Sequence, residues 1–287
     1  MTNSIKLKPA RAMIDQLEQE GRLAPGGRVI ESSSGNLAVA LSMICAARGY
    51  QFICVTDPNI SRQSAKLVEA YGAKLVVVRV RDQNGGFLGS RIACIHDMIR
   101  EDPSLVWVNQ YENLANPRAH YEQTARQIAR AFPHIDWLFI GAGTTGTLVG
   151  VSSYFREHRP ETHIIAVDAT GSVTFGTPAG CRKIPGLGTS SPPPISRLAS
   201  YDQLVTIEEP QTIRMCRQVA TRGLLLGGSS GTVLSAVHRL LPEIPPEAVI
   251  VAISPDNGDR YLDTIYCDQW VTNQFGIGVL NEHYTTV

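Results

Sequence analysis

The sequence predicts an α/β fold built on parallel β-sheet. Eight short runs rich in Val and Ile recur along the 287 residues, and they lack strict alternation of apolar and polar positions. Such runs are typical of parallel strands that helices cover on both faces. Most of the runs are separated by segments with helical periodicity, which indicates repeated βα units with right-handed crossovers. Periodicity alone leaves open whether the strands close into a barrel or lie in one or two open sheets.

The expected elements alternate along most of the chain. Strands are expected at residues 28–34, 52–57, 74–80, 105–111, 137–143, 163–169, 204–209 and 248–254. Helical periodicity is clearest at residues 36–49, 62–73, 118–132 and 230–241. Residues 170–198 form the longest irregular stretch and carry many of the glycines and prolines. A loop of that length is usually functional or disordered.

Composition and charge exclude several classes of protein. The chain has 26 Lys and Arg residues against 26 Asp and Glu residues and no basic block, which argues against a nucleic-acid-binding protein. No apolar run reaches the roughly 18 residues of a membrane span, and the N-terminus lacks the apolar stretch of a signal peptide, so we expect a cytoplasmic protein. The six cysteines show no CxxC or Cys/His metal spacing, so we expect no metal site, and we expect Cys45 and Cys54, which lie in apolar stretches, to be reduced core residues.

Three turns rich in Gly, Ser and Thr each open an expected helix. They are SSSGN at residues 32–36, GAGTTGT at 141–147 and GGSSG at 227–231. At a helix N-terminus, backbone N–H groups and the helix dipole favour an anion. Taken alone, each turn is equally well explained as a tight connection or a helix cap. GAGTTGT lacks the lysine of a Walker loop and the spacing of a dinucleotide fingerprint, so it fits a small phosphorylated cofactor better than a nucleotide.

Together with SIKLK at residues 4–8, these turns resemble the fold type II pyridoxal-phosphate enzymes, the family of cysteine synthase and cystathionine β-synthase. The resemblance runs from Ser4 to about Tyr266. Six motifs occur in the family's order, namely SIK, SSGN, the GAGTTGT loop, GLG at 186–188, GGSSG and PDNGDRYL at 255–262.

The resemblance implies a fold and an assembly. Two α/β domains, each with an open and mostly parallel sheet flanked by helices, are expected to hold pyridoxal 5'-phosphate in the cleft between them. We place the smaller domain at residues 1–112, with residues 52–100 as its mobile part, and the larger cofactor-binding domain at residues 113–287. Amino-acid substrates and a homodimer are expected as well.

The resemblance also assigns roles residue by residue. It makes Lys6 the lysine that holds the cofactor as a Schiff base and then moves the substrate's α-proton. Asn36 matches the residue at the cofactor's ring hydroxyl, and Ser229 the residue at its pyridine nitrogen. The implied phosphate-binding residues are Gly143, Thr144, Thr145, Gly146 and Thr147, and the implied substrate-binding residues are Ser33, Ser34, Gly35, Arg91, Gln110, Tyr111 and Gly186. Because a neutral serine does not keep the ring nitrogen protonated, we expect β-elimination followed by addition of a nucleophile, with transamination suppressed.

Three departures from the cysteine synthase pattern bear on the reaction. SIKLK stands where those enzymes typically read SIKDR, Thr145 where they usually have glycine, and Arg91 where they usually have a small residue. With these departures the chain is similar to the branch of the family that makes 2,3-diaminopropionate precursors for siderophores. That branch joins O-phospho-L-serine to L-glutamate by way of an aminoacrylate, giving N-(2-amino-2-carboxyethyl)-L-glutamate and phosphate. Arg91 and Tyr111 are then candidates for holding the extra anionic groups, unless Arg91 is a surface residue of a helix.

Two other functions stay open. One is a cysteine synthase that uses O-acetylserine or O-phosphoserine with sulfide, which needs less recognition of the second substrate. The other is a truncated, non-catalytic homologue that binds the cofactor or a partner, because family members carry a further segment ahead of the lysine motif and Met1 lies five residues before Lys6. For a chain without that segment we expect weak cofactor retention and an exposed sheet edge. Asp256 and Arg260 either shape the ring side of the site or order their own loop.

Overall fold

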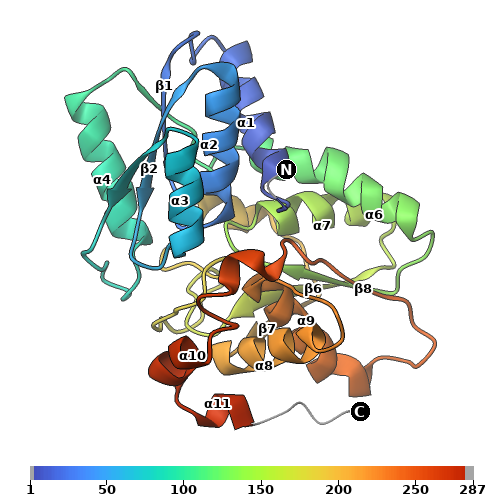
Figure 1. Ribbon diagram of the computed structural model, residues 1–287. Coiled ribbons are helices and arrows are strands. Elements are labelled where there is room, and N and C mark those ends of the chain that lie inside the picture. The colour runs from blue at the N-terminus through green and yellow to red at the C-terminus, as the bar shows by residue number, and fades with distance from the viewer. Residues whose placement is uncertain (1–2, 282–287) are drawn as a thin grey trace.

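In the computed structural model, which describes residues 3–281, eight strands form two four-stranded sheets (Figure 1). The strands are β1 (Arg28–Ser32), β2 (Gln51–Thr56), β3 (Lys74–Val77), β4 (Leu105–Trp107), β5 (Trp137–Gly141), β6 (His163–Ala169), β7 (Gln203–Ile207) and β8 (Ile250–Ala252). Their order is β3-β2-β1-β4 in the first sheet and β7-β6-β5-β8 in the second, and all neighbouring strands are parallel. All eight expected strands are present, and the two open sheets confirm the fold class that the resemblance implied.

The helices lie between and around these strands in βα order. They are α1 (Leu7–Gln19), α2 (Asn36–Arg48), α3 (Arg62–Ala70), α4 (Leu88–Glu101), α5 (Ala115–Ala119), α6 (Arg126–Ala131), α7 (Gly146–His158), α8 (Glu209–Ala220), α9 (Gly228–Leu240), α10 (Asp268–Phe275) and α11 (Gly278–Asn281). No helix of the described residues is long and apolar enough to cross a membrane. All six cysteines are free thiols, and Cys45 and Cys54 are buried, as expected for those two.

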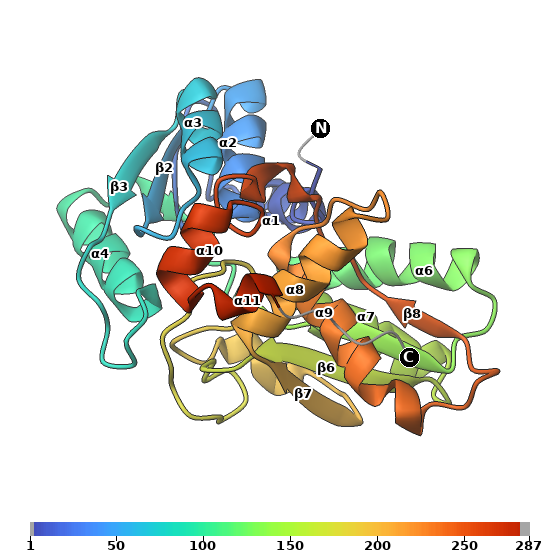
Figure 2. The same ribbon diagram turned by 60° about the horizontal axis from the view of Figure 1, so that its bottom comes forward.

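Helices cover both faces of the first sheet (Figures 1 and 2). On one face Val29 of β1 joins Met13 of α1 and Leu41 of α2 in a single core cluster. On the other face Ile30 of β1 packs with Ile95 of α4. Neighbouring residues of β1 therefore point to opposite faces, yet both are fully buried. This explains why the run shows no alternation in the sequence.

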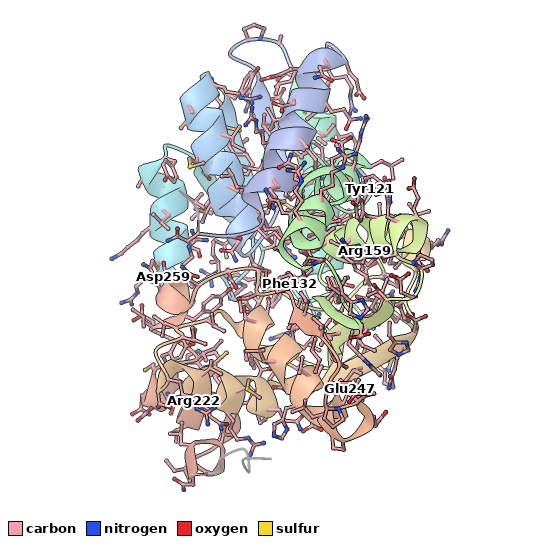
Figure 3. The ribbon with its side chains drawn as sticks, turned by 90° about the vertical axis from the view of Figure 1, so that its right-hand side faces the viewer. Tyr121, Phe132, Arg159, Arg222, Glu247 and Asp259 are labelled. Carbon is pink, nitrogen blue, oxygen red and sulfur yellow. The ribbon has the colours of Figure 1, made fainter. Side chains whose placement is uncertain are left out.

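The second sheet is covered in the same way. Leu138 of β5 packs with Phe155 of α7, and the next residue, Phe139, packs on the opposite face with Ala236 of α9. Arg159, which ends α7, donates to the carbonyls of Phe132 (2.7 Å) and Ala129 (2.8 Å), and so ties α7 to α6 (Figure 3). β8 pairs only with β5 among the named strands and forms an edge of this sheet.

The start of the described chain connects the two halves. Ser4 forms an antiparallel bridge with Asp256, and Ile5 packs against the core of the second sheet, whereas α1 packs into the core of the first. The first sheet lies within residues 1–112 and the second within 113–287. Those domain limits, and the mobility of residues 52–100, stay predictions.

The expected helix at residues 118–132 is not one regular helix. Its first two residues end α5, a π-helical turn follows at His120–Ala125, and α6 completes the segment. The π-turn faces α7, where Gly150 leaves room, since a Cβ there would lie 2.7 Å from the Cβ of His120. Turns of this kind occur often at functional sites. In this protein the turn places His120 Nε2 3.3 Å from the hydroxyl of Thr147, the second residue of α7.

Candidate active site

Two adjoining cavities lie at the carboxyl ends of the parallel strands, where ligands of open α/β sheets bind. We call the larger, of about 150 Å³, the main cavity, and the smaller, of about 70 Å³, the inner cavity. Lys6, Asn36, Gly143, Thr144 and Gly186 line both. Every residue expected at the site lines at least one, with Ser33, Ser34, Gly35, Arg91, Gln110 and Tyr111 in the main cavity and Thr145, Gly146, Thr147 and Ser229 in the inner cavity.

Lys6 is held firmly although it lies close to the chain's start. The backbone N–H of Ile5 donates to the carbonyl of Pro255 (2.8 Å), and that of Lys6 donates to the hydroxyl of Ser4 (3.2 Å). Desolvation lowers the pKa of the Lys6 amine to about 8, an effect that the charge of Asp256 partly opposes. An amine with this pKa has an appreciable neutral fraction near neutrality, as a nucleophile and a base require.

Asn36, the first residue of α2, is held by a buried polar cluster. Its Nδ2 donates to Asp256 Oδ2 (2.6 Å), which also accepts from the hydroxyl of Tyr261 (2.7 Å), and its Oδ1 accepts from Arg260. A carboxylate only accepts and a guanidinium only donates, so the two partners fix the orientation of the amide. The second N–H of Nδ2 stays available to a ligand. Asp256 and Arg260 therefore orient Asn36, the first of the two roles considered for them.

The turn before α7 has the shape of an anion cradle. Thr145 adopts a left-handed conformation (φ 66°), and α7 begins at the next residue. A Cβ on Gly143 would lie 2.4 Å from the carbonyl oxygen of Gly186, and a Cβ on Gly146 2.2 Å from Asn116 Oδ1. Only glycine fits these two positions, so the turn packs closely against Gly186 and Asn116 at the edge of the inner cavity. The N–H groups that open α7 are placed to bind an anion in that cavity.

A chain of polar groups supports this cradle from behind. Lys8 Nζ donates to Thr124 Oγ1 (3.3 Å), which lies 3.0 Å from His120 Nδ1, and His120 Nε2 lies 3.3 Å from Thr147 Oγ1. Burial and the charges of Lys6 and Lys8 hold the pKa of His120 well below its usual value, so its ring is neutral. Because an ammonium group only donates, we infer that each group donates to the next and that the Thr147 hydroxyl proton is free to point at the anion.

On the far side of the main cavity, Arg91 is buried rather than a surface residue of α4. Its Nη1 lies 3.2 Å from Asp57 Oδ2, and its Nε has no hydrogen-bond partner among the described residues. A buried guanidinium with an unsatisfied donor at a cavity wall is suited to an anionic ligand.

Gln110 and Tyr111 brace the SSSGN turn. Gln110 Nε2 donates to the carbonyl of Ser32 (2.8 Å), and the hydroxyl of Tyr111 donates to the same oxygen (3.2 Å). Burial raises the pKa of Tyr111, which keeps the phenol neutral. Ser33 Oγ accepts from the backbone N–H of Gly35 (3.3 Å) and of Ala38 (3.2 Å) and so caps α2. The turn is thus rigid, with the start of α2 facing the main cavity.

Sequence reasoning missed several residues that shape the site, namely Lys8, Glu31, Asp57, Asn116, His120 and Thr124. Glu31 lies fully buried behind the SSSGN turn, where its carboxyl group accepts from the N–H of Ser32 (2.9 Å) and of Gln110 (3.3 Å). Burial raises the pKa of Glu31 to about 8. The only signal for it was an acidic residue inside an otherwise apolar strand, which argues for a buried, partnered group.

Comparisons with known proteins agree with this geometry. A model of the family described as "Pyridoxal-phosphate dependent enzyme" matches residues 1–256 of the chain. The chain belongs to that family. Its cofactor is therefore pyridoxal phosphate, and it is an enzyme, as the sequence motifs implied.

Relatives and solved structures are similar to the chain along most of its length. The N-(2-amino-2-carboxyethyl)-L-glutamate synthase of Ralstonia nicotianae is 40% identical over 270 residues, which cover 93% of this chain and 80% of that protein. A lysine-to-alanine variant of O-ureido-L-serine synthase with O-ureido-L-serine bound is 29% identical, with a TM-score of 0.86, covering 96% of this chain and 84% of that one. The O-acetylserine-dependent cystathionine β-synthase of Helicobacter pylori is 26% identical, with a TM-score of 0.86, covering 93% and 87%.

The residues of the inner cavity fit the cofactor. The turn at residues 143–147 lines the inner cavity at the start of α7, where a phosphate would meet backbone N–H groups, and Lys6 opens onto the same cavity as a desolvated amine. Gly186 adopts a positive φ of 118°, and a Cβ there would lie 2.3 Å from Ser229 Oγ, so the glycine leaves the serine hydroxyl uncovered. A phosphate cradle, an amine and a neutral hydroxyl are what the cofactor's phosphate, aldehyde and ring nitrogen require.

The chain of donors behind the cradle leads to a first prediction. Replacing Thr124 with valine removes the hydroxyl that connects Lys8 to His120, so the Thr147 proton is no longer directed at the phosphate. We expect the dissociation constant of pyridoxal phosphate to rise about fivefold, which corresponds to the net free energy of about one hydrogen bond. Equilibrium dialysis followed by absorbance measures it. Thr124→Ser, which keeps the hydroxyl, is the matched control, and equal constants for the valine and serine variants would show that the chain of donors has no such role.

Proposed function

We propose that the protein joins O-phospho-L-serine to L-glutamate, giving N-(2-amino-2-carboxyethyl)-L-glutamate and phosphate. The observation that carries the proposal is Arg91, a buried cation in the wall of the main cavity with an unsatisfied Nε. A phosphate leaving group needs such a cation, whereas an acetyl group does not. The name of the Ralstonia nicotianae relative supports the same reaction.

Different side chains of the site carry out different steps of the reaction. When bound, pyridoxal phosphate supplies an electron sink that makes the substrate's α-proton acidic. Lys6 takes that proton, since its lowered pKa of about 8 gives it a neutral fraction. The SSSGN turn holds the α-carboxylate at the start of α2, and Arg91 binds the phosphate while the bond from the β-carbon to oxygen breaks.

The proposal extends to the acceptor, the assembly and the pathway. The glutamate amine forms a bond to the β-carbon, and Lys6 returns to the α-carbon the proton that it took. The proton that the amine loses balances the one carried away by the phosphate as hydrogen phosphate. We propose that the enzyme is a cytoplasmic homodimer that supplies a 2,3-diaminopropionate precursor for a siderophore. The composition of the chain supports the compartment, and the family resemblance supports the dimer and the pathway.

Mixing the holoenzyme with O-phospho-L-serine and either L-glutamate or sulfide tests this function. We expect phosphate release and a product of the mass of N-(2-amino-2-carboxyethyl)-L-glutamate by mass spectrometry, with glutamate favoured over sulfide in kcat/KM. Cysteine formation from sulfide, with glutamate inert, would instead make the enzyme a cysteine synthase.

A paired variant isolates the role of Arg91 in the same assay. Arg91→Gln combined with Asp57→Asn removes both charges, so that neither is left buried alone. We expect KM for O-phospho-L-serine to rise about ten- to a hundredfold, because a charge-assisted hydrogen bond is lost. O-acetyl-L-serine, which lacks the phosphate, is the control substrate. An equal rise in KM for both substrates would remove Arg91 as the phosphate ligand.

A further inference from the structure

A third cavity, of about 540 Å³, opens beside the main cavity, and we call it the outer cavity. Three stretches line it: residues 58–62, which lead from β2 into α3, residues 183–185, and residues of the segment 261–274 that ends in α10. Figures 1 and 2 both show this last segment facing the end of α3. The outer cavity therefore lies where the two halves of the molecule meet.

The outer cavity is continuous with the main cavity. Asn59, Ile184 and Pro185 line both, and none of the three carries a charge. Residues 183–185 lead directly into Gly186, which lies against Ser229. A molecule in the outer cavity is thus next to the place where the first substrate reacts.

Two cations line the outer cavity, and neither has an ion-pair partner among the described residues. They are Arg62, in the first turn of α3, and Lys183. The backbone around Lys183 is fixed, since the carboxylate of Glu209 accepts from the N–H of Lys183 (2.8 Å) and of Ile184 (2.6 Å). The opposing charge in the lining is Asp263, which is exposed. The cavity carries a surplus of positive charge that suits an anion.

Other cations near the main cavity already hold the protein together. Arg182 donates to the carbonyl of Leu187 (2.9 Å), Arg81 to the carbonyl of Gly85, and Arg91 faces Asp57. Within residues 3–281, neither the Arg62 nor the Lys183 side chain makes a comparable bond, although the charge of Lys183 also acts on the carboxylate of Glu209. These two cations are therefore the ones left for a second anionic substrate.

We propose that the outer cavity binds the acceptor amino acid, with Arg62 and Lys183 at its carboxylates and its amine directed past Asn59 and Pro185 toward the main cavity. The inference rests on the proposed function and specifies where its second substrate binds. It also explains a preference for a dicarboxylic acceptor, because sulfide needs neither cation. The class of acceptor is an amino acid whose side chain carries a carboxylate.

Charge-removing variants that keep side-chain bulk test the site. For Arg62→Gln combined with Lys183→Gln we expect KM for L-glutamate to rise about fivefold or more, as for two partly exposed ion pairs. The ratio of kcat/KM for L-glutamate to that for L-glutamine should fall by a similar factor, because glutamine lacks the side-chain charge. Asp263→Asn removes the opposing charge and should lower KM for glutamate, the opposite of the effect expected for the double variant. Lys66→Gln, an exposed lysine of α3 outside the cavity, is the matched control.

Two further measurements separate this inference from the proposed function. Phosphate released from O-phospho-L-serine without acceptor reports the first step, and calorimetric titration of the holoenzyme with glutarate reports dicarboxylate binding without an amine. Suppose that the wild type turns over glutamate, and that the double variant has the same KM for glutamate and the same affinity for glutarate as the wild type. The outer cavity is then not the acceptor site, while the proposed function stands. If glutamate is inert but glutarate binds only with Arg62 and Lys183 intact, the site is supported and the glutamate reaction is wrong. If the holoenzyme does not bind glutarate, and the double variant leaves the ratio of kcat/KM for glutamate to that for glutamine unchanged, the proposed site is overturned.

Discussion

Replacing Lys6 with alanine is expected to lower kcat at least about 10³-fold, because one amine both anchors the cofactor and moves the α-proton. The residue lines both the main and the inner cavity, and no other lysine does. Reduction of the holoenzyme with borohydride, followed by peptide mass spectrometry, should find the cofactor on Lys6. Lys66→Ala, which removes an exposed lysine, should leave kcat unchanged.

Two readouts distinguish this role from a structural one. Small amines such as methylamine should restore part of the activity of Lys6→Ala, since they enter the cavity left by the side chain. In the wild type, the rate at which the apoprotein takes up pyridoxal phosphate covalently should rise with pH and level off above about 8, where the Lys6 pKa lies. A lysine with its ordinary pKa would level off near 10.5. Failure of amine rescue together with a rise continuing past pH 10 would exclude Lys6 as the reacting amine.

Much of the fold was predictable because its signals are local. Runs such as residues 137–143 are apolar on both faces, and only a strand covered by helices on two sides tolerates that pattern. The turns rich in Gly, Ser and Thr were also recognisable locally, whereas the roles of their residues came from the family resemblance. Turns at the carboxyl ends of parallel strands meet at one edge of the sheet. SSSGN, GAGTTGT and GGSSG are far apart in sequence, yet residues of all three line the two adjoining cavities.

The residues that sequence reasoning missed act through contacts across the chain. Lys8 reaches Thr124 from 116 positions away, and nothing in either segment marks the pair. His120 was expected inside a regular helix, because periodicity does not detect a π-turn. Asp57 ended an expected strand, and its pairing with Arg91 depends on where α4 packs. Such partners follow from tertiary packing, so the sequence predicted residues that line the two cavities but not the groups that orient them.

Replacing Asp256 with alanine is expected to cause the largest loss of stability of any single substitution around the ring side of the site. Asp256 is buried, and its Oδ2 accepts from both Asn36 (2.6 Å) and Tyr261 (2.7 Å), while Arg260 faces the same cluster. Its removal leaves two buried donors without their acceptor and the buried Arg260 guanidinium without a nearby opposite charge, which costs about 3 kcal/mol. For a chain of this size that lowers Tm by roughly 6–12 °C in calorimetry. Affinity for pyridoxal phosphate should fall as well, because Asn36 loses its fixed orientation.

Two control variants separate the loss of the Asp256 acceptor from the loss of its charge. Asp259→Ala removes a neighbouring, half-buried carboxylate whose charge raises the pKa of Asp256, and it should cost far less stability than Asp256→Ala (Figure 3). Asp256→Asn keeps the acceptor without the charge. Desolvation raises the pKa of Asp256 in the folded state, so the folded protein holds that proton more tightly, and the ionised carboxylate costs stability as pH rises through the folded-state pKa. The wild type should therefore lose stability relative to Asp256→Asn as pH rises from about 4 toward neutrality.

The same substitution connects the cluster to the chemistry. The charge of Asp256 opposes the desolvation that lowers the Lys6 pKa, so Asp256→Asn should move the plateau of cofactor uptake to a pH below 8. A purely structural role for Asp256 predicts a lower Tm for the alanine variant and no movement of that plateau. A shift of the plateau in the asparagine variant, at a Tm near that of the wild type, would show that the carboxylate tunes the reacting amine as well as holding Asn36.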